Sequence, residues 1–299
     1  MSRAAPGEGW LVTGAGGQLG SALVAELSRR GARVVGRDAA AFDVADADAV
    51  ARALADARPA WLLNAAAYTD VDGCERDPVR AKTVNAQAPA LLAERCREAG
   101  VRLFHVSTDY VFDGRAARPL REDDPVAPLS EYGRSKLAGE RAVLAASPEF
   151  TVVRTSWVFG RGRNFIRAIL ARAGAARADP GLGPLRVVDD QVGSPTWADD
   201  LAPAVLALLE RGGRGLYHLA NRGAASRLEL ARLALDAAGH ADLEIVPVKT
   251  ADYPLPAQRP LYTALDCGRA ERLGAVLRPW QEAVRAYVAS TPDPAASGR

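Results

Sequence analysis

Short apolar runs alternate with longer stretches of helical period along the first half of the chain. The apolar runs predict strands at residues 10–13, 33–35, 61–64, 102–107 and 151–155. The stretches between them, rich in alanine, leucine and arginine, predict helices at residues 18–30, 45–57, 86–99 and 130–146. Strands that alternate with helices are typical of a parallel sheet covered on both faces. The pattern therefore predicts an α/β fold built on a doubly wound parallel sheet.

The pattern loosens after residue 157, where glycine, arginine and proline become frequent. Helical stretches remain at residues 164–173 and 197–210, and a short strand at 215–219. We predict a first domain over residues 1–158 that takes back segments near 190–220, and a smaller, discontinuous C-terminal lobe over residues 159–290. Residues 291–299 are rich in proline, serine, alanine and glycine, which predicts a flexible tail.

Composition and charge exclude several classes of protein. A chain of 299 residues with 48% hydrophobic content can bury a sizeable core. The net charge is +2 and the basic residues are dispersed, so we expect no nucleic-acid partner. Three distant cysteines fit a reducing compartment, so the expected location is the cytoplasm, and they form no metal-site spacing with the three histidines. Residues 1–9 lack the apolar stretch of a signal peptide, and no run approaches the ~20 apolar residues that cross a bilayer, so we expect no membrane association.

A glycine-rich turn follows the first predicted strand and opens the first predicted helix. It places Gly14, Gly17 and Gly20 around Gln18 and Leu19. Glycine permits the tight turn and lets the backbone approach a pyrophosphate, whose charge the helix N-terminus favours. Such turns are common, but this position at the first strand-to-helix junction predicts dinucleotide binding in a Rossmann sheet.

The end of the second strand bears on which dinucleotide binds. In a Rossmann sheet, an acid at this point binds the ribose hydroxyls, whereas an arginine accommodates a 2′-phosphate. This chain has Arg37 followed by Asp38. Arg37 favours NADPH, and Asp38 keeps NADH possible; alternatively, both are solvated loop residues.

A tyrosine and a lysine stand four positions apart in the helix predicted at residues 130–146. On a helix, Tyr132 and Lys136 share one face and can act on one substrate atom. A phenol has a pKa of ~10, and a cation within ~4–6 Å lowers such a value by roughly 1–3 units. We therefore expect Lys136 to lower the pKa of Tyr132. The pair arises easily by chance, and its place after the fourth strand, behind the glycine turn, is what gives it weight.

Hydroxyl side chains stand where the fourth strand ends. Ser107 and Thr108 come at the carboxyl edge of the sheet, where ligands of such folds lie. We predict that Thr108 hydrogen-bonds a reacting carbonyl. The alternative is that both hydroxyls cap a loop.

Longer motifs resemble one family from about Leu11 to Asp266. They are, in order, the glycine turn from Gly14 to Gly20, NAAAYT from Asn64 with Val71-Asp72, Asn85-Ala86, STDYVFDG from Ser107, Tyr132-Gly133 with KLAGE from Lys136, RTSWV from Arg154, Asn164-Phe165, DDQVGSPT from Asp189, and Arg259-Pro260. Together they resemble the extended short-chain dehydrogenase/reductase superfamily and, within it, the dTDP-4-dehydrorhamnose reductases. The STDYVFDG, RTSWV and DDQxGxPT segments discriminate most.

The resemblance implies a ketone reduction. Hydride would pass from NADPH to C4 of dTDP-4-dehydro-β-L-rhamnose, giving dTDP-β-L-rhamnose, while Tyr132 protonates the developing alkoxide. Thr108 would orient the carbonyl, and Lys136 would hold the nicotinamide ribose. The resemblance also assigns the first domain to the cofactor and the lobe mainly to the dTDP-sugar.

The same resemblance implies binding roles for further residues. Those implied to bind the cofactor are Gly14, Gly17, Gln18, Leu19, Gly20, Arg37, Asp38, Asp43, Val44, Ala65, Ala66, Tyr68, Asn85, Tyr132 and Lys136. Those implied to bind the substrate are Val71, Thr108, Asp109, Tyr110, Trp157, Asn164 and Arg259. For Trp157, an ordinary place in the core is the alternative.

Two positions depart from the family pattern. Family members can bind Mg²⁺ through acidic residues at a subunit interface, but Ala22 stands where one of those acids is expected. We therefore expect no metal site and leave open whether the chain is a monomer or a homodimer. Thr263 replaces the usual serine, which we expect to change little.

Two other functions remain open. A reductase of another dTDP-4-keto-6-deoxysugar, for example of the dihydrostreptose type, would keep nearly all these motifs. A non-catalytic regulatory subunit, similar to the β subunit of methionine adenosyltransferase, would keep the fold, but the intact Thr108, Tyr132 and Lys136 argue against it.

Overall fold

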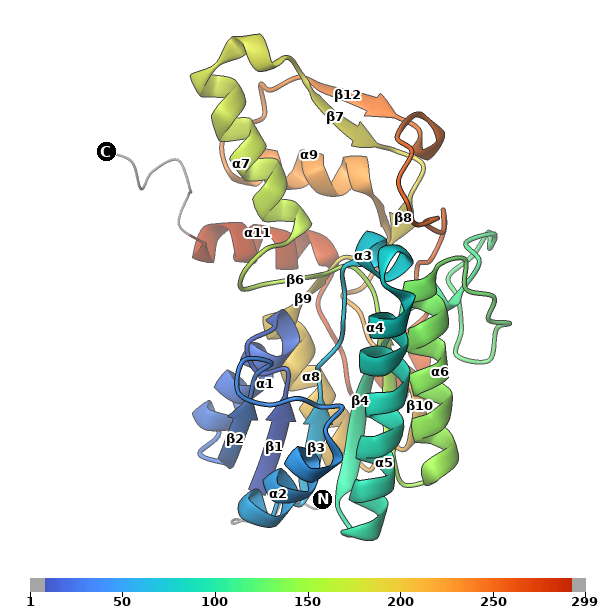
Figure 1. The fold of residues 1–299 in the computed structure, drawn as a ribbon. Coiled ribbons are helices and arrows are strands. Elements are labelled where there is room, and N and C mark those ends of the chain that lie inside the picture. The colour runs from blue at the N-terminus through green and yellow to red at the C-terminus, as the bar shows by residue number, and fades with distance from the viewer. Residues whose placement is uncertain (1–8, 292–299) are drawn as a thin grey trace.

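A six-stranded parallel sheet forms the base of the molecule (Figure 1). The computed structural model describes residues 9–291, so the predicted tail, apart from Thr291, lies outside the described residues. The strand order is β10-β5-β4-β3-β1-β2, and every neighbouring pair runs parallel. The strands are β1 (Gly9–Thr13), β2 (Arg33–Arg37), β3 (Trp61–Asn64), β4 (Arg102–Thr108), β5 (Thr151–Thr155) and β10 (Gly215–His218).

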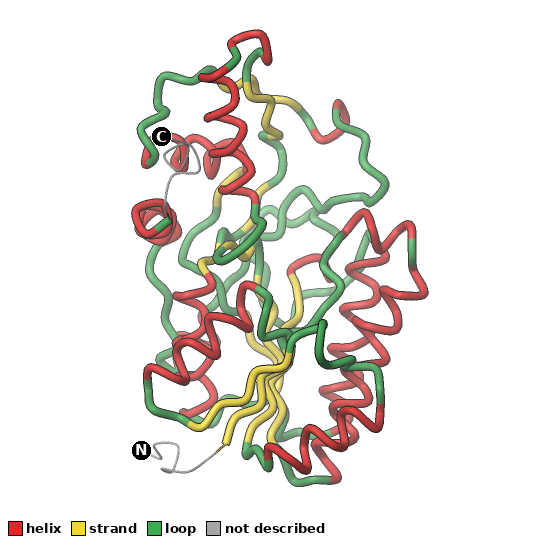
Figure 2. Tube along the Cα trace, turned by 60° about the vertical axis from the view of Figure 1, so that its left-hand side comes forward, coloured by secondary structure: helices red, strands yellow, loops and turns green. Residues whose placement is uncertain are grey.

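Helices cover both faces of this sheet (Figure 2). One apolar cluster packs α1 (Gln18–Arg29) and α8 (Ala198–Glu210) against the strands. A second cluster packs α2 (Ala47–Ala57), α5 (Ala88–Glu98) and α6 (Glu131–Ala146) against the other face. The predicted α/β class with a doubly wound parallel sheet is therefore confirmed.

Capping side chains set where two of these helices begin. Asp46 accepts hydrogen bonds from the backbone N–H groups of Asp48 and Ala49 at the start of α2. Ser130 accepts one from the N–H of Gly133 at the start of α6. A capping residue has extended backbone, so each helix begins just after it rather than at the predicted residue.

Short helices connect β3 to α5 at the edge of the sheet. They are α3 (Val71–Arg76), α4 (Pro78–Lys82) and the π-helical turn η1 (Thr83–Gln87), which runs directly into α5. Asn85 lies buried in this turn. After β4, the 3₁₀ turn η2 (Asp109–Val111) leads the chain over the carboxyl edge of the sheet.

A smaller lobe sits beyond that carboxyl edge (Figure 1). Its core joins α7 (Phe165–Ala178), α9 (Arg227–Ala237) and α11 (Trp280–Ser290) to the parallel pair β7 (Leu185–Val188) and β12 (Ile245–Val248). The remaining short elements are β6 (Val158–Phe159), β8 (Val192–Gly193), β9 (Thr196–Trp197), β11 (Ala225–Ser226), η3 (Pro180–Leu182), η4 (Thr250–Asp252) and α10 (Gly268–Arg272).

The chain crosses between the two parts more than once. After α7 and β7 in the lobe, α8 packs beside α1 and β10 pairs with β5 at the edge of the large sheet. The chain then returns to the lobe for α9 and β12. Between residues 9 and 291, no helix has the length and apolar character needed to span a bilayer.

Candidate active site

A cavity of about 450 Å³ lies between the sheet and the lobe. It is bounded by the carboxyl ends of β4 and β5, the glycine turn and the start of α6. Ligands of open parallel sheets bind at this edge, because the loops that leave the strands meet there. The predicted site residues that line it are Gly17, Gln18, Leu19, Ala65, Val71, Thr108, Asp109, Tyr110, Tyr132, Lys136 and Trp157.

The glycine turn presents bare backbone to this cavity. Gly14 has a φ of 69°, and a Cβ added there would lie 2.6 Å from the backbone nitrogen of Ala66. A Cβ on Gly20 would clash with the carbonyl oxygen of Gly14, so the first turn of α1 packs directly on the loop. Gly17 caps α1 without any side-chain hydrogen bond. The N–H groups at this helix end therefore suit the pyrophosphate of a dinucleotide.

Arg37 and Asp38 lie beside the glycine turn. The carbonyl oxygen of Arg37 accepts the N–H of Ala15 at 3.0 Å, and a Cβ on Gly16 would lie 3.4 Å from the Cβ of Asp38. In the described part of the chain, the Arg37 side chain makes no salt bridge. Its guanidinium therefore suits an additional phosphate on the adenine ribose.

Nine of the predicted cofactor residues do not line the cavity: Gly14, Gly20, Arg37, Asp38 and Ala66, which lie at or beside the glycine turn, and Asp43, Val44, Tyr68 and Asn85. Val44 belongs to the core under the sheet, and Asp43 accepts the N–H of Ala45 in the same loop. Asn85 accepts the N–H of Tyr68 at 2.8 Å and donates to its carbonyl oxygen at 3.0 Å. Asn85 thereby fixes the loop that follows β3.

The hydroxyl groups of Thr108 and Tyr132 meet at the cavity. Thr108 Oγ1 donates to Asp109 Oδ1 at 3.2 Å and accepts the backbone N–H of Tyr110 at 3.2 Å. It also lies near enough to the Tyr132 phenol to influence its pKa. The Tyr110 ring packs edge-on against that of Tyr132, with centroids 5.5 Å apart.

Burial raises the pKa of Tyr132 above its ordinary value, and the neighbouring Thr108 hydroxyl opposes that rise. Lys136 directs its Nζ elsewhere, to the carbonyl oxygen of Val106 at 2.7 Å and to Nε2 of His105 at 3.4 Å. The expectation that Lys136 lowers the pKa of Tyr132 is therefore wrong for this structure. Tyr132 keeps its proton at neutral pH, which is the state that a proton donor requires.

The pKa of Lys136 is also shifted from its ordinary value. Burial lowers the pKa of Lys136 to about 8, and the carboxylate of Glu140, one helical turn away, opposes that shift. Glu140 is held by Arg154, through Nη2–Oε1 at 2.5 Å and Nε–Oε2 at 2.9 Å, and by the Ser107 hydroxyl at 2.8 Å. Ser107 thus supports α6 from β4 as well as lining the cavity.

Asp109 organises the hydroxyl groups around it. Besides Thr108, the hydroxyls of Ser156 and Thr263 donate to its Oδ2, at 2.8 and 2.5 Å. Burial raises the pKa of Asp109, and the three hydroxyl hydrogen bonds oppose that rise. Thr263 makes with its hydroxyl the bond that a serine could also make. The small effect expected of this replacement stays a prediction.

Trp157 stands over the cavity in a strained backbone conformation. Its φ is 45°, which is rare for a residue with a side chain and is typical of functional sites. A Cβ on Gly193 would lie 2.5 Å from the indole ring. The glycine of the DDQVGSPT segment therefore makes room for the Trp157 ring.

Arg227 links this cavity to a second one. Arg227 is the first residue of α9. Its guanidinium carbon lies 3.5 Å from the centroid of the Trp157 ring, and its charge lies near Tyr110. Burial lowers the pKa of Arg227 below its ordinary value. Among the described residues, none forms a salt bridge with it, so its buried charge is available to an anionic ligand.

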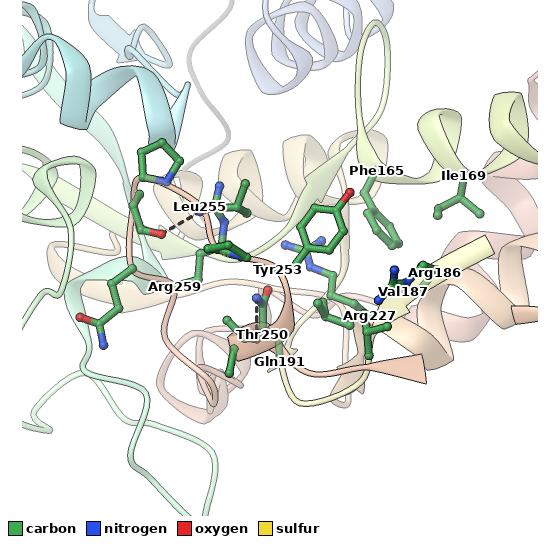
Figure 3. Close-up of a pocket in the computed structure, with 17 residues that line it drawn as sticks. Phe165, Ile169, Arg186, Val187, Gln191, Arg227, Thr250, Tyr253, Leu255 and Arg259 are labelled. Atoms are coloured by element: carbon green, nitrogen blue, oxygen red, sulfur yellow. Dashed lines mark hydrogen bonds between the residues drawn. The ribbon is translucent and has the colours of Figure 1, made fainter. Parts of the chain in front are cut away.

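The second cavity has a volume of about 650 Å³ and lies in the lobe (Figure 3). Its wall is largely apolar, with basic side chains at intervals. The residues that Figure 3 labels are Phe165, Ile169, Arg186, Val187, Gln191, Arg227, Thr250, Tyr253, Leu255 and Arg259. An elongated ligand could therefore reach from this cavity past Arg227 to Tyr132, which lines the smaller one.

Two predicted substrate residues lie outside the smaller cavity. Arg259 lines the larger one, where its Nη2 contacts Asp72 Oδ2 at 2.7 Å. Asn164 departs from the expectation that it lines the sugar pocket. It caps α7, accepts the N–H of Arg167 at 3.0 Å and donates to the carbonyl oxygen of Gly160 and the Tyr287 hydroxyl, both at 2.8 Å. These bonds direct its amide into the lobe.

Comparison with known proteins decides the family. The model of the RmlD substrate binding domain matches residues 9–292. The chain belongs to the RmlD substrate binding domain family. A dTDP-4-dehydrorhamnose reductase of Mycobacterium tuberculosis (strain H37Rv) is 44% identical over 288 residues, which cover 94% of this chain and 92% of the relative. The family resemblance of the sequence motifs is thus confirmed.

Solved structures of the RmlD type have the same architecture. A dTDP-4-dehydrorhamnose reductase of Clostridium acetobutylicum superposes with a TM-score of 0.89 at 34% identity, covering 94% of this chain and 98% of that one. A second, from Bacillus anthracis in complex with NADP, has a TM-score of 0.87 at 31% identity, covering 95% and 100%. These likenesses extend across both the sheet and the lobe.

The sequence analysis missed Arg227 and the larger cavity of this RmlD-type chain. Arg227 is one of 38 basic residues, and no motif marks it. A weak signal was its place between Ser226 and Glu229, which form a capping box at the start of α9. For metals, residues 9–291 contain no group of three histidine, cysteine, aspartate or glutamate side chains that could hold an ion.

Proposed function

We propose that this protein uses NADPH to reduce the C4 keto group of dTDP-4-dehydro-β-L-rhamnose to dTDP-β-L-rhamnose. The observation that carries the proposal is that Thr108 and Tyr132 line the same cavity as the glycine turn and Lys136. The family supports the same reaction, because relatives that match most of the chain are named dTDP-4-dehydrorhamnose reductase.

The side chains at the cavity perform the acid catalysis. NADPH, when bound, supplies hydride to C4. Tyr132 Oη then gives its proton to the oxygen that becomes an alkoxide, and burial keeps that proton in place until it is needed. Thr108 holds the phenol and the carbonyl in line, and Asp109 fixes the Thr108 hydroxyl. Lys136, on the same helix face as Tyr132, holds the ribose next to the nicotinamide.

The two cavities suit the two ends of a nucleotide-linked sugar. The deoxysugar would lie among Val71, Tyr110 and Trp157 in the smaller cavity. The diphosphate would pass Arg227, whose charge has no acidic partner among the described residues, and approach Arg259. The thymidine would then contact the apolar wall of the larger cavity. In this arrangement the sheet domain binds the cofactor and the lobe binds the nucleotide.

Cofactor choice follows from the loop after β2. Arg37 suits the 2′-phosphate of NADPH, whereas Asp38, at the same loop, suits the free ribose hydroxyls of NADH. A relative from Bacillus anthracis was solved with NADP. NADPH is therefore the proposed cofactor, with NADH as a weaker alternative.

A reductase of another dTDP-4-keto-6-deoxysugar is the second candidate. A Streptomyces antibioticus relative named as a probable dTDP-4,6-dihydroxy-2-methyloxan-3-one 4-ketoreductase is 42% identical over 280 residues, covering 92% of this chain and 93% of the relative. The name of this relative, which refers to a different 4-keto sugar, supports the second candidate.

The deciding experiment supplies the purified protein with NADPH and a panel of dTDP-4-keto-6-deoxysugars. Oxidation of NADPH is followed by absorbance, and the stereochemistry at C4 of each product is assigned by NMR. We expect the highest kcat/KM with dTDP-4-dehydro-β-L-rhamnose. A higher value with another sugar would favour the second candidate, and no oxidation with any sugar would refute the reductase. Light scattering with and without Mg²⁺ would distinguish a monomer from a homodimer.

A further inference from the structure

A line of buried polar side chains runs behind Lys136. It joins Thr13 on β1, Asn64 on β3, His105 on β4 and Lys136 on α6, across neighbouring strands (Figure 1). The contacts are Thr13 Oγ1 to Asn64 Oδ1 at 2.7 Å, Asn64 Nδ2 to His105 Nδ1 at 3.0 Å, and His105 Nε2 to Lys136 Nζ at 3.4 Å. All four residues are at most 1% exposed, so each donor must find its acceptor within the protein.

A backbone N–H fixes the direction of these hydrogen bonds. The N–H of Ala66 lies 3.1 Å from Asn64 Oδ1 and can act only as a donor. The Asn64 oxygen is therefore committed to Ala66 and Thr13, and the Asn64 amide N–H faces His105. Nδ1 of His105 must then accept, so it carries a lone pair and no hydrogen.

The protonation state of His105 follows from its burial. Burial lowers the pKa of His105 well below its ordinary value, and the nearby Lys136 lowers it further, so the imidazole is neutral. A neutral imidazole carries one N–H, and Nδ1 has none. The hydrogen therefore lies on Nε2, directed at Lys136 Nζ.

We propose that His105 is a positioning residue whose Nε2–H donates to Lys136, so that the amine form of this lysine is favoured. An ammonium has three N–H donors and no lone pair, so it would face the Nε2–H donor to donor. An amine satisfies both contacts, because it donates to the Val106 carbonyl oxygen and accepts from His105. The role of Lys136 in turnover rests on the proposed function.

The charged groups around Lys136 agree with this assignment. Glu140 is the acid that favours the ammonium, but its carboxylate is shared with Arg154 and Ser107. Tyr132 is neutral, and Arg154 lies beyond Glu140. The lowered pKa of Lys136, about 8, is consistent with an amine that is accessible near neutral pH.

The first test determines the His105 tautomer in the cofactor-free wild-type protein. ¹⁵N NMR distinguishes the protonated from the unprotonated ring nitrogen, and the chain has three histidines to assign. We expect hydrogen on Nε2 and a lone pair on Nδ1. Hydrogen on Nδ1, or an imidazolium at neutral pH, would overturn the proposal without any variant having to fold.

The second test titrates the lysines of the cofactor-free protein labelled with ¹³C at Cε. The chain has three lysines, so Lys82 and Lys249 serve as internal references for Lys136. Asn64→Asp keeps the oxygen that Ala66 requires but turns the donor to His105 into an acceptor, which moves the hydrogen of His105 to Nδ1. The lone pair on Nε2 then favours the Lys136 ammonium. We therefore expect the titration midpoint of Lys136 to rise by about one pH unit or more.

Two further variants separate this effect from the added charge. Thr13→Val removes a hydroxyl but leaves the Ala66 contact, so the Lys136 midpoint should stay within a few tenths of a unit. In a His105→Phe background, Asn64→Asp can act only through its charge. An equal rise in both backgrounds would contradict the proposal, whereas a rise that needs His105 supports it. None of these readouts involves substrate, so they hold or fail independently of the proposed reaction.

Discussion

The two cavities of this protein are built in different ways. The smaller one is walled by the ends of neighbouring strands and by α6, and its polar groups, such as Thr108 and Asp109, are hydrogen-bonded to one another. The larger one lies against the short β7 and β12 pair and the loop after it, where Tyr253 is 54% and Leu255 44% exposed. Under the proposed function, the reacting atoms would meet a rigid surface in the smaller cavity, whereas the nucleotide would meet an adaptable one in the larger cavity. Substitutions should therefore affect kcat in the first cavity and KM in the second.

The largest effect is expected for Tyr132→Phe in the rigid cavity. Loss of the proton donor should lower kcat by roughly 10²–10⁴-fold, with the Kd for NADPH within a few-fold of wild type. Steady-state kinetics and fluorescence titration measure the two quantities. Tyr262→Phe, which removes a phenol outside both cavities, is the matched control. Undiminished turnover in Tyr132→Phe would refute its assignment as the acid.

Arg227→Leu should produce the next largest effect, on KM. The loss of a charge-assisted contact to the diphosphate should raise KM for the sugar nucleotide by roughly 10–100-fold, with a smaller change in kcat. The KM of Arg227→Lys should lie between those of the wild type and Arg227→Leu, because lysine keeps the positive charge but lacks the planar guanidinium group. Arg222→Ala, which removes an exposed arginine paired with Glu271, is the control. A fall in kcat with KM unchanged would place Arg227 in the rigid cavity instead.

Gly193→Ala probes the point where the two cavities meet. The added methyl group would displace the Trp157 ring, and overpacking of this kind costs about 1–3 kcal/mol. We expect a lower melting temperature and a several-fold higher KM. A double-mutant cycle with Trp157→Phe tests the cause, because part of the cost should disappear when the smaller ring is present. Strict additivity would show that Gly193 acts elsewhere.

Arg37→Ala should have a moderate effect that concerns the cofactor only. Loss of the contact to the 2′-phosphate should weaken NADPH by about tenfold and leave NADH nearly unchanged. The Kd of each cofactor is measured by fluorescence titration. Equal weakening of both would mean that Arg37 does not contact the 2′-phosphate.

The smallest effect is expected for Asp72→Asn, which loosens the loop of the adaptable cavity. Arg259 lowers the pKa of Asp72, so the pair stabilises the folded protein at neutral pH and is lost as the pH falls through that lowered value. The variant should lose about 1 kcal/mol or less of unfolding free energy at pH 7. The difference from wild type should vanish in acid, as urea unfolding at several pH values would show. A difference that persists in acid would contradict the pairing.

Much of the rigid cavity could be predicted from the sequence. The strands at residues 61–64 and 151–155 are found as predicted, because buried parallel strands are short apolar runs between turn residues. The glycine turn, Thr108, Tyr132 and Lys136 meet because loops at the ends of neighbouring parallel strands share one edge. The division of the chain into domains at particular residues stays a prediction.

Little of the adaptable cavity could be predicted. Helices α9 and α11 and the β7 and β12 pair were not foreseen, and α7 extends to Ala178, five residues beyond the predicted end. Strands of four residues or fewer carry too little periodicity to be recognised, and their partners are distant in the chain. The role proposed for Arg227 depends on where α9 packs, which no local pattern records.

The sequence by itself determined the sheet and the glycine turn, and it was enough to propose Tyr132 as the acid, because these depend on local periodicity and on motifs within single strand-to-helix junctions. The tertiary structure decided the electrostatics. Whether Lys136 faces Tyr132 or His105 depends on side chains from β1, β3 and β4 that meet only in the folded protein. The pKa values of the buried groups depend on desolvation, and the extent of burial is a property of the whole fold.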